Sequence, residues 1–155
     1  MGQRASEYDR IDGDTYVTPQ WVWDELYSVE PKFKLAWDCA PANAEYDFLQ
    51  CESMADNNIA TNPPFKLSVK FVNRALLLTH SSNNAVAMLL PMEWDCARGR
   101  VDLFDGLPFK AKYVIQTRIR WTNLEQKKNG PSKNHAWYVW DWAYRGQPTM
   151  GWIGR

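Results

Sequence analysis

A run of five residues, Thr61-Asn62-Pro63-Pro64-Phe65, lies between two apolar stretches and has the residue types needed to hold a planar amino group. Asn62 precedes a proline, which favours an extended backbone, and neither proline has an N–H. The segment is therefore a stiff bend with two acceptors, the Asn62 side-chain oxygen and the Pro63 carbonyl. These can accept both hydrogens of an exocyclic amino group while a base stacks on Phe65, an arrangement suited to methylation of that nitrogen. A Pro-Pro turn with an incidental asparagine is the alternative.

Helical and extended patterns alternate on both sides of this run, which predicts an α/β fold. Thr18 is expected to cap a helix that has Pro19 at its first position, and Phe33, Leu35 and Trp37 alternate with polar or small residues as in a strand. The predicted elements are a helix over 18–28, strands over 33–38 and 58–61, a helix over 67–80, a strand over 85–90, a helix over about 96–104, and strands over 112–118 and 135–142.

The order of these elements predicts a mostly parallel sheet of about five strands with an antiparallel C-terminal hairpin at its edge. In such sheets, ligands bind beyond the carboxyl ends of the strands. Asp38 and Asn62 each follow a predicted strand directly. If those strands are neighbours, both side chains project into the same crevice.

The charge is zero overall but unevenly distributed along the chain. Residues 1–60 carry 4 Lys and Arg against 12 Asp and Glu, whereas residues 98–133 carry 9 against 3. This asymmetry indicates that a polyanion contacts the C-terminal half. A solvated loop that balances an acidic surface is the alternative.

Composition limits the other kinds of chemistry. The 155 residues are expected to form one domain after a polar N-terminal segment, 1–14. Cys39, Cys51 and Cys96 are too scattered for a disulfide framework or a zinc site, and neither histidine lies near metal ligands in the sequence. The sequence therefore predicts no metal, and without a signal peptide or a long apolar run it is expected to be cytosolic.

Several segments together resemble the S-adenosylmethionine-dependent amino-methyltransferases, and most closely the small DNA N6-adenine methyltransferases of phages and prophages. The resemblance covers nearly the whole chain. The similar segments are Thr15-Tyr16-Val17-Thr18-Pro19 with Trp21, Trp37-Asp38-Cys39-Ala40, 58–65, Met88-Leu89-Leu90-Pro91, Arg118-Ile119-Arg120-Trp121 and 135–140. The Asn-Pro-Pro-Phe segment is the most specific of them.

The resemblance implies a reduced Rossmann-like methyltransferase fold, S-adenosylmethionine as cofactor and double-stranded DNA as partner. An adenine is flipped out of the duplex, stacks on Phe65 and is held through N6 by Asn62 and Pro63. The implied catalytic residues are Asn62, Pro63, Pro64 and Phe65. The implied cofactor-binding residues are Tyr16, Thr18, Pro19, Trp21, Asp38, Cys39, Ala40 and Asn62. The expected substrate contacts are Phe65, Asp47, Arg118, Arg120, Trp121, Lys127 and Lys128.

The chain departs from the family in the region expected to bind the cofactor. No glycine follows Asp38 in Cys39-Ala40-Pro41-Ala42-Asn43-Ala44, and only 23 residues separate Asp38 from Asn62. A parallel crossover needs about a dozen residues or more, so two edge strands are expected to be missing. Glu45, Glu52 and Asp56 remain as candidates to bind the ribose.

Three further assignments rest on local pattern. Asp47-Phe48-Leu49 either matches an acidic segment near the target base or belongs to a crossover helix whose apolar face is Ala44, Phe48, Cys51 and Ala55; the helix is the preferred interpretation. Trp137 is expected in the core, and Trp121 either in the core or on a base. Lys127, Lys128 and Lys133 lie in a loop that either follows a DNA backbone or only connects strands.

The leading hypothesis is an active DNA adenine methyltransferase in a phage-infected or prophage-carrying bacterial host. The alternatives are the same chemistry on RNA adenine or a protein amide, and a catalytically deficient relative that binds nucleic acid or a partner. Cofactor binding distinguishes the first two from the third. A homodimer is a further possibility, because a shortened sheet has an exposed edge.

Overall fold

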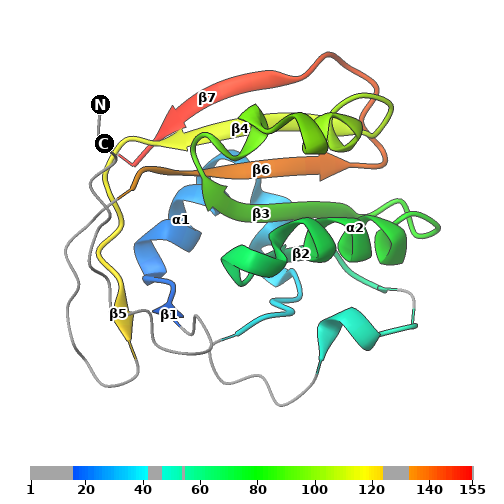
Figure 1. The fold of residues 1–155 in the computed structure, drawn as a ribbon, viewed down its shortest axis with the longest axis horizontal. Coiled ribbons are helices and arrows are strands. Elements are labelled where there is room, and N and C mark those ends of the chain that lie inside the picture. Colours follow the sequence, from blue (N-terminus) through cyan, green and yellow to red (C-terminus); the bar gives the residue numbers. More distant parts are fainter. Residues whose placement is uncertain (1–15, 42–46, 54, 124–132, 155) are drawn as a thin grey trace.

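The computed structural model describes residues 16–41, 47–53, 55–123 and 133–154. They form an α/β fold around a mixed five-stranded sheet with the order β2-β3-β6-β4-β7 (Figure 1). The strands are β2 (Ile59–Thr61), β3 (Ala85–Pro91), β4 (Phe109–Ile115), β6 (His135–Asp141) and β7 (Thr149–Ile153).

Four strands run in one direction and one runs against them. β2 is parallel to β3 and β4 is parallel to β7, whereas β6 is antiparallel to both of its neighbours, β3 and β4. The predicted C-terminal hairpin is thus present as the β4·β6 pair. The prediction that its antiparallel strand lies at the edge is wrong, because β6 lies in the centre of the sheet.

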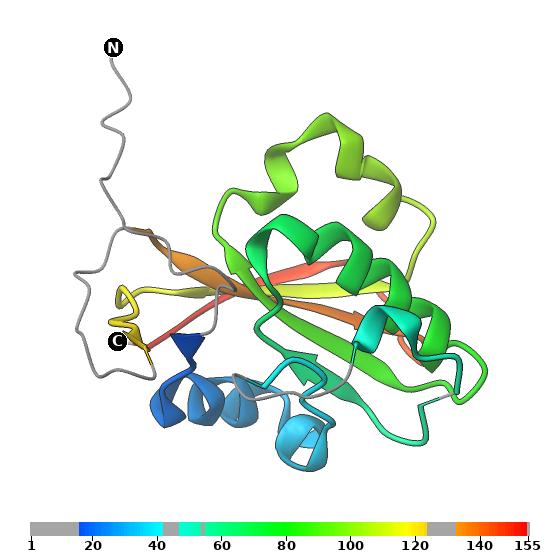
Figure 2. The same cartoon turned by 60° about the horizontal axis from the view of Figure 1, so that its bottom comes forward.

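Helices cover both faces of the sheet. Helix α1 (Gln20–Val29) packs on one face and α2 (Ser68–Thr79) on the other, with the sheet between them (Figure 2). The strands are therefore buried on two sides, and β3 alternates between two cores: Ala87 and Leu89 face α1, whereas Met88 and Leu90 face α2. This explains why its sequence is continuously apolar.

Two buried tryptophans of β6 bind covering elements to the sheet, and a third joins two covering elements to each other. Trp137 on β6 donates its indole N–H to the carbonyl of Val22 in α1 at 3.1 Å, and Trp140 donates to Leu103 at 2.7 Å. Trp94 donates to the Ser68 hydroxyl of α2 at 2.9 Å. The prediction that Trp137 lies in the core is confirmed, since its side chain is fully buried.

The predicted strand over 33–38 is wrong. Residues Pro31–Leu35 form a 3-10 helix, η1, in which Phe33 is buried and Leu35 is 83% exposed. Pro31 lacks an N–H and suits the first turn of a helix. Only Trp37 joins the sheet, through a parallel bridge to Ile59 that continues the order beyond β2. The first strand of the expected fold is thus reduced to a single residue pair.

Several boundaries also differ from those predicted. Thr18 does not cap α1; Pro19 occupies that position and its carbonyl accepts from the Val22 N–H at 3.0 Å. The helix expected near 96–104 is two 3-10 turns, η4 (Trp94–Cys96) and η5 (Arg98–Leu103). Strand β4 ends at Ile115, so residues 116–118 lie beyond it.

The crossover before β2 contains no α-helix in its described part, residues 47–53. A single 3-10 turn, η2 (Phe48–Gln50), is present instead, and Phe48 packs its ring 5.5 Å from Trp37 and 5.1 Å from Phe71. The favoured helical interpretation is therefore wrong for these residues. Residues 42–46 and 54, which include Ala44, lie outside the described residues.

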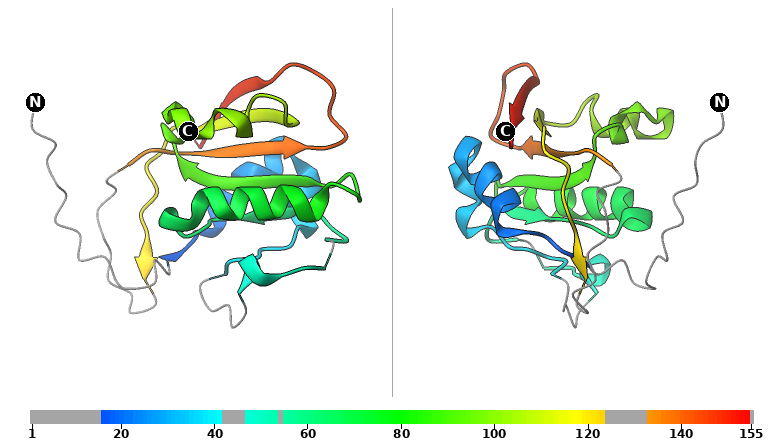
Figure 3. Two further views of the ribbon diagram at one scale, coloured as in Figure 1. Left: turned by 45° about the vertical axis from the view of Figure 1, so that its right-hand side comes forward. Right: turned by 90° about the vertical axis from the view of Figure 1, so that its left-hand side faces the viewer.

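Two short features were not predicted. Strand β7 extends the sheet beside β4, and β1 (Tyr16–Val17) pairs with β5 (Thr122–Asn123) as a separate antiparallel ribbon. Figure 3 shows that β5 lies apart from the main sheet, beside β1. The ribbon brings the first described residues to the end of the sheet at which β4 stops.

Candidate functional site

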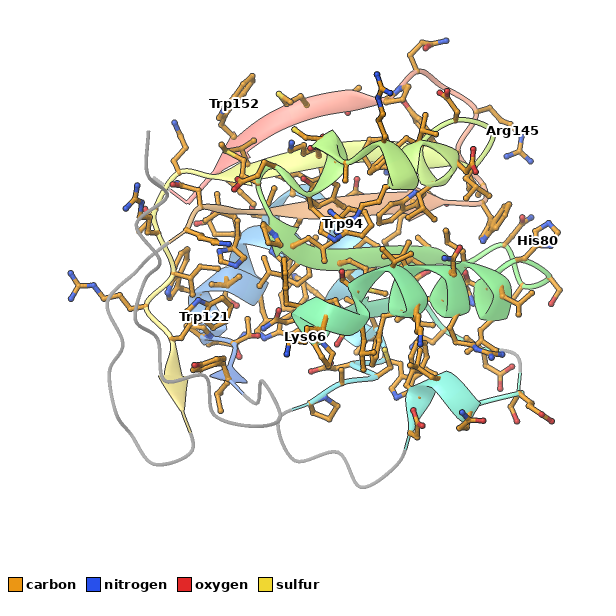
Figure 4. The ribbon with its side chains drawn as sticks, in the orientation of Figure 1. Lys66, His80, Trp94, Trp121, Arg145 and Trp152 are labelled. Carbon is orange, nitrogen blue, oxygen red and sulfur yellow. The ribbon has the colours of Figure 1, made fainter. Side chains whose placement is uncertain are left out.

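Most of the predicted site residues lie at one edge of the sheet. The parallel strands β2, β3, β4 and β7 end at this edge and β6 begins there, as the register of Pro91 opposite His135 and of Ile115 opposite Ile153 requires. We call it the carboxyl edge. Figure 4 places Lys66 and Trp121 in this half of the molecule, and His80 and Arg145 at the opposite end.

The Asn-Pro-Pro-Phe segment connects β2 to α2 at the carboxyl edge. Asn62 is partly exposed, and no hydrogen bond within the described residues engages its side-chain amide. Pro63 is buried, and the Pro64 carbonyl accepts from the Leu67 N–H at 2.9 Å, which opens the 3-10 turn η3 (Phe65–Leu67) before α2. The Phe65 side chain is 41% exposed. A free amide and an accessible ring thus stand three residues apart.

Asp38 is fixed beside this segment by a side-chain contact. The Thr61 hydroxyl donates to Asp38 Oδ1 at 2.7 Å, and the Ala40 N–H donates to the same oxygen at 3.2 Å. Burial raises the pKa of the Asp38 carboxyl above its ordinary value, and these two hydrogen bonds oppose the shift. Asp38 is thus joined to the residue directly before Asn62. No hydrogen bond among the described residues joins Asp38 to Asn62 itself, so the crevice they are expected to share stays a prediction.

The neighbours of Asp38 are not nucleophiles. Cys39 is 1% exposed, and burial followed by the negative charge of Asp38 raises the pKa of its thiol far above the ordinary value. The thiol is therefore protonated. Burial, then the charges of Asp24 and Asp38, raise the pKa of the Tyr27 hydroxyl on α1.

The N-terminal residues predicted to bind the cofactor lie near the ribbon and the start of α1. Tyr16 is on β1, with its ring 6.1 Å from Trp121, while Thr18 and Pro19 connect β1 to α1. Trp21 packs against the core on the α1 face. No hydrogen bond or ring contact among the described residues joins Tyr16 or Trp21 to Asp38 or Asn62.

The predicted basic substrate contacts lie at the same edge. Arg118 and Arg120 are exposed, with the buried Ile119 between them. Arg118 donates through Nε to Asn134 Oδ1 at 3.2 Å. Trp121 is partly buried and stands edge-on to His135 at 5.3 Å between ring centroids. Lys127 and Lys128 lie outside the described residues.

His135 was not predicted as a site residue. Its Nδ1 is buried and has no hydrogen-bond partner. Burial lowers the pKa of His135 to about 4; a backbone hydrogen bond with Lys133 opposes the shift, the positive charge of Lys133 adds to it, and the charge of Glu93 opposes it. The imidazole is therefore neutral at physiological pH.

The remaining acidic candidates have other surroundings. The Asp47 carboxylate accepts from the Leu49 N–H at 2.9 Å and so caps η2, which is a structural role. Glu52 and Asp56 are exposed, and no described contact ties them to Asp38. Glu45 lies outside the described residues. None of these acids is brought to Asn62 by a contact in the structure.

Two residues, Thr61 and Asn134, were missed as contributors to this edge, as was the contact of Lys133 with Phe65. Thr61 holds Asp38, Asn134 receives Arg118, and Lys133 places its ammonium over the Phe65 ring at 5.6 Å from the centroid. A hydroxyl residue directly before the motif was a readable signal for the first. Lys133 and Phe65 are far apart in the sequence, so no local pattern indicates the third.

Neither a metal cluster nor a spanning helix occurs in the part of the chain that the structure describes. No three His, Cys, Asp or Glu side chains there are grouped to hold a metal ion, and no helix there is long and apolar enough to cross a membrane. No protein-family model and no curated protein matches this chain.

Proposed function

We propose that this chain transfers a methyl group from S-adenosylmethionine to N6 of adenine in duplex DNA, on a reduced Rossmann-like methyltransferase fold. The observation that carries the proposal is the position of Asn-Pro-Pro-Phe directly after a parallel strand, one residue beyond the hydroxyl that holds Asp38. Ligands of open α/β sheets bind at this edge.

The motif has the acceptors and the ring that an amino group on a planar base requires. The Asn62 amide is free of intramolecular partners among the described residues, so its oxygen can accept from N6. The Pro63 carbonyl is a second acceptor, and Phe65 offers an accessible face for stacking. Two acceptors on one amino group disfavour delocalisation of the nitrogen lone pair into the ring. Positioning of this kind needs no strong base.

The described residues fit the amino acid end of the cofactor. The Asp38 carboxylate accepts only two described bonds, both through Oδ1, and it lies at the sheet edge where a cationic amino group can be received. When bound, S-adenosylmethionine supplies an electrophilic methyl group on a sulfonium. Asp38 would hold the charged end, and Asn62 would hold the acceptor nitrogen.

The test is transfer of labelled methyl from S-adenosylmethionine to unmethylated duplex DNA. We expect N6-methyladenine from the natural protein and a loss of roughly a hundredfold or more in Asn62→Ala, as for removal of one positioned transition-state contact. Asn73→Ala is the matched control, because Asn73 is exposed on α2 and should leave transfer unchanged. No methyl transfer to DNA by the natural protein would refute the proposal.

A second candidate function is nucleic-acid binding without catalysis. The reduction of the first strand to the Trp37 bridge favours it, since that strand and its glycine loop form part of the family's cofactor pocket. Titration calorimetry with S-adenosylmethionine separates the two candidates. Binding of the cofactor supports the enzyme, whereas DNA binding without cofactor binding supports the alternative. RNA and a glutamine-containing peptide serve as comparison substrates in the same assay.

A further inference from the structure

The exposed ring of the motif is already in contact with a cation. Lys133 Nζ lies over the Phe65 ring, 5.6 Å from its centroid, and both side chains are exposed. Lys133 precedes β6 by two residues, whereas Phe65 follows β2, so the contact bridges two segments of the carboxyl edge. A base that stacks on this face of Phe65 must displace the ammonium.

The main chain beside Lys133 is held by hydrogen bonds, whereas its side chain is exposed. The Asn134 carbonyl accepts from the Met92 N–H at 3.0 Å, after the end of β3. The Asn134 side chain accepts from Arg118 at 3.2 Å. The backbone next to Lys133 is therefore fixed while its ammonium group is exposed. Arg118, through its bond to Asn134, is a second cation beside this segment.

The surface around this lysine is suited to a polyanion. Segments 116–121 and 133–135 contain three cations, Arg118, Arg120 and Lys133, and no acid. Lys66, next to Phe65, is a further exposed cation, and Glu93 is the nearby exposed acid. Lysine binds a phosphate as a compact point charge and needs no fixed geometry.

The two possible contacts of Phe65 differ in strength. An exposed cation–π contact changes an equilibrium constant by roughly two- to fivefold. A base stacked on an aromatic side chain changes it by roughly five- to 150-fold. Exchange of lysine for a base is therefore favourable at the ring, and a nearby backbone phosphate gives the displaced ammonium a new partner.

We propose that Lys133 is a positioning residue that covers Phe65 in the free protein and contacts a phosphate of the target strand once a base occupies the ring. The proposal rests on the proposed function, because it takes Phe65 as the stacking surface for the target base. Stacking of the target base on Phe65 is thereby coupled to a contact between Lys133 and the DNA backbone next to that base.

The experiment compares Lys133→Ala, Lys133→Arg and Lys34→Ala. Lys34 is an exposed lysine of η1, so its removal gives the same change in net charge away from the motif. Binding to a fluorescein-labelled duplex of mixed sequence is followed by anisotropy over a series of salt concentrations. The logarithm of the DNA association constant falls linearly with the logarithm of the salt concentration. Loss of one phosphate contact makes this negative slope shallower by about 0.9.

We expect this reduced slope for Lys133→Ala, and natural slopes for Lys133→Arg and Lys34→Ala. In the methylation assay, Lys133→Ala should raise the KM for DNA roughly fivefold, which corresponds to about 1 kcal/mol, with kcat nearly unchanged. Lys133→Arg should restore KM, a recovery that loss of a merely structural side chain would not show.

An unchanged salt slope and KM in Lys133→Ala would overturn the inference. Tighter binding with an unchanged slope would overturn it as well, since the lysine would then only block the ring. A reduced slope in a protein that transfers no methyl group would uphold the phosphate contact and refute the proposed function. If the natural protein transfers methyl groups and Lys133→Ala has the natural salt slope and KM, the inference is refuted and the proposed function is not.

Discussion

Replacement of His135 by phenylalanine should remove a large pH-dependent part of the stability. The imidazole has a buried, unpartnered Nδ1 and packs edge-on against Trp121. Burial lowers its pKa from 6.5 to about 4 and outweighs a backbone hydrogen bond with Lys133, which raises the pKa. Phenylalanine keeps the aromatic contact and cannot be protonated, so it isolates the effect of the proton.

The sign follows from proton linkage. In the unfolded chain the imidazole takes up a proton as the pH falls through 6.5, whereas in the folded protein it does so only near pH 4. The contribution of His135 to the free energy of unfolding is therefore fully present above pH 6.5 and is lost as the pH falls towards 4. At about 1.4 kcal/mol per pH unit, the full loss is about 3 kcal/mol, or roughly 6–12 °C in Tm for a chain of this size.

Thermal unfolding followed by circular dichroism measures this difference between neutral pH and about pH 4. The natural protein should lose stability relative to His135→Phe over that range, and His80→Phe, at the exposed second histidine, should behave like the natural protein. The raised pKa of Asp38 acts in the opposite sense but is common to all three proteins, so it cancels in the comparison. Parallel curves for the natural protein and His135→Phe would refute the reasoning.

Three further substitutions test other contacts. Glu30 is 3% exposed and accepts from two side chains of β4 at 2.8 and 2.9 Å, so Glu30→Gln should lower the free energy of unfolding in urea by about 2 kcal/mol, whereas the exposed Glu52→Gln should leave it unchanged. Ser68→Ala leaves the buried Trp94 indole N–H without an acceptor and should lower it by about 1–3 kcal/mol; an unchanged urea midpoint would contradict this. Thr61→Val keeps the buried shape but removes the hydroxyl that holds Asp38, so calorimetry should show roughly tenfold weaker binding of S-adenosylmethionine, and natural affinity would exclude this role.

The elements that could be predicted are those whose pattern of apolar residues matches the faces that they bury. β3 is apolar throughout because both of its faces are covered, and α2 shows its buried face at helical spacing. The alternation around Phe33 was misleading because Leu35, in the middle of it, is 83% exposed. Lys32 instead pairs with the buried Asp141 at the far end of β6. An ion pair that spans 109 residues leaves no local pattern.

Short elements with weak local preference were missed for a related reason. β7 has only five residues, and two of them, Met150 and Trp152, are exposed, so its pattern differs from that of a half-buried strand with polar outward residues. It forms because β4 offers a free edge beside it. The 3-10 turns η4 and η5 are likewise held by tertiary contacts, such as the Arg100 guanidinium over Trp94 at 4.4 Å.

The candidate site could be predicted where a strand end determines a side chain's place. The end of β2 fixes Asn62, and the motif itself contains the bends that expose Phe65. The contacts made by Lys133 and Asn134 depend on how β6 enters the centre of the sheet, between β3 and β4. That position was predicted at an edge, and the neighbours of Phe65 could not follow from it.

The short structure beside β2 bears on how the proposed cofactor site would be held. A full first strand would hold Asp38 through ladder hydrogen bonds, but here the Trp37 bridge is the one described pair. The Thr61 hydroxyl supplies the missing restraint from β2, the same strand that delivers Asn62. In the function proposed here, the group that holds the cofactor and the group that holds the base are therefore fixed by adjacent residues. Their relative position then depends on the end of β2 and much less on the strands that are absent.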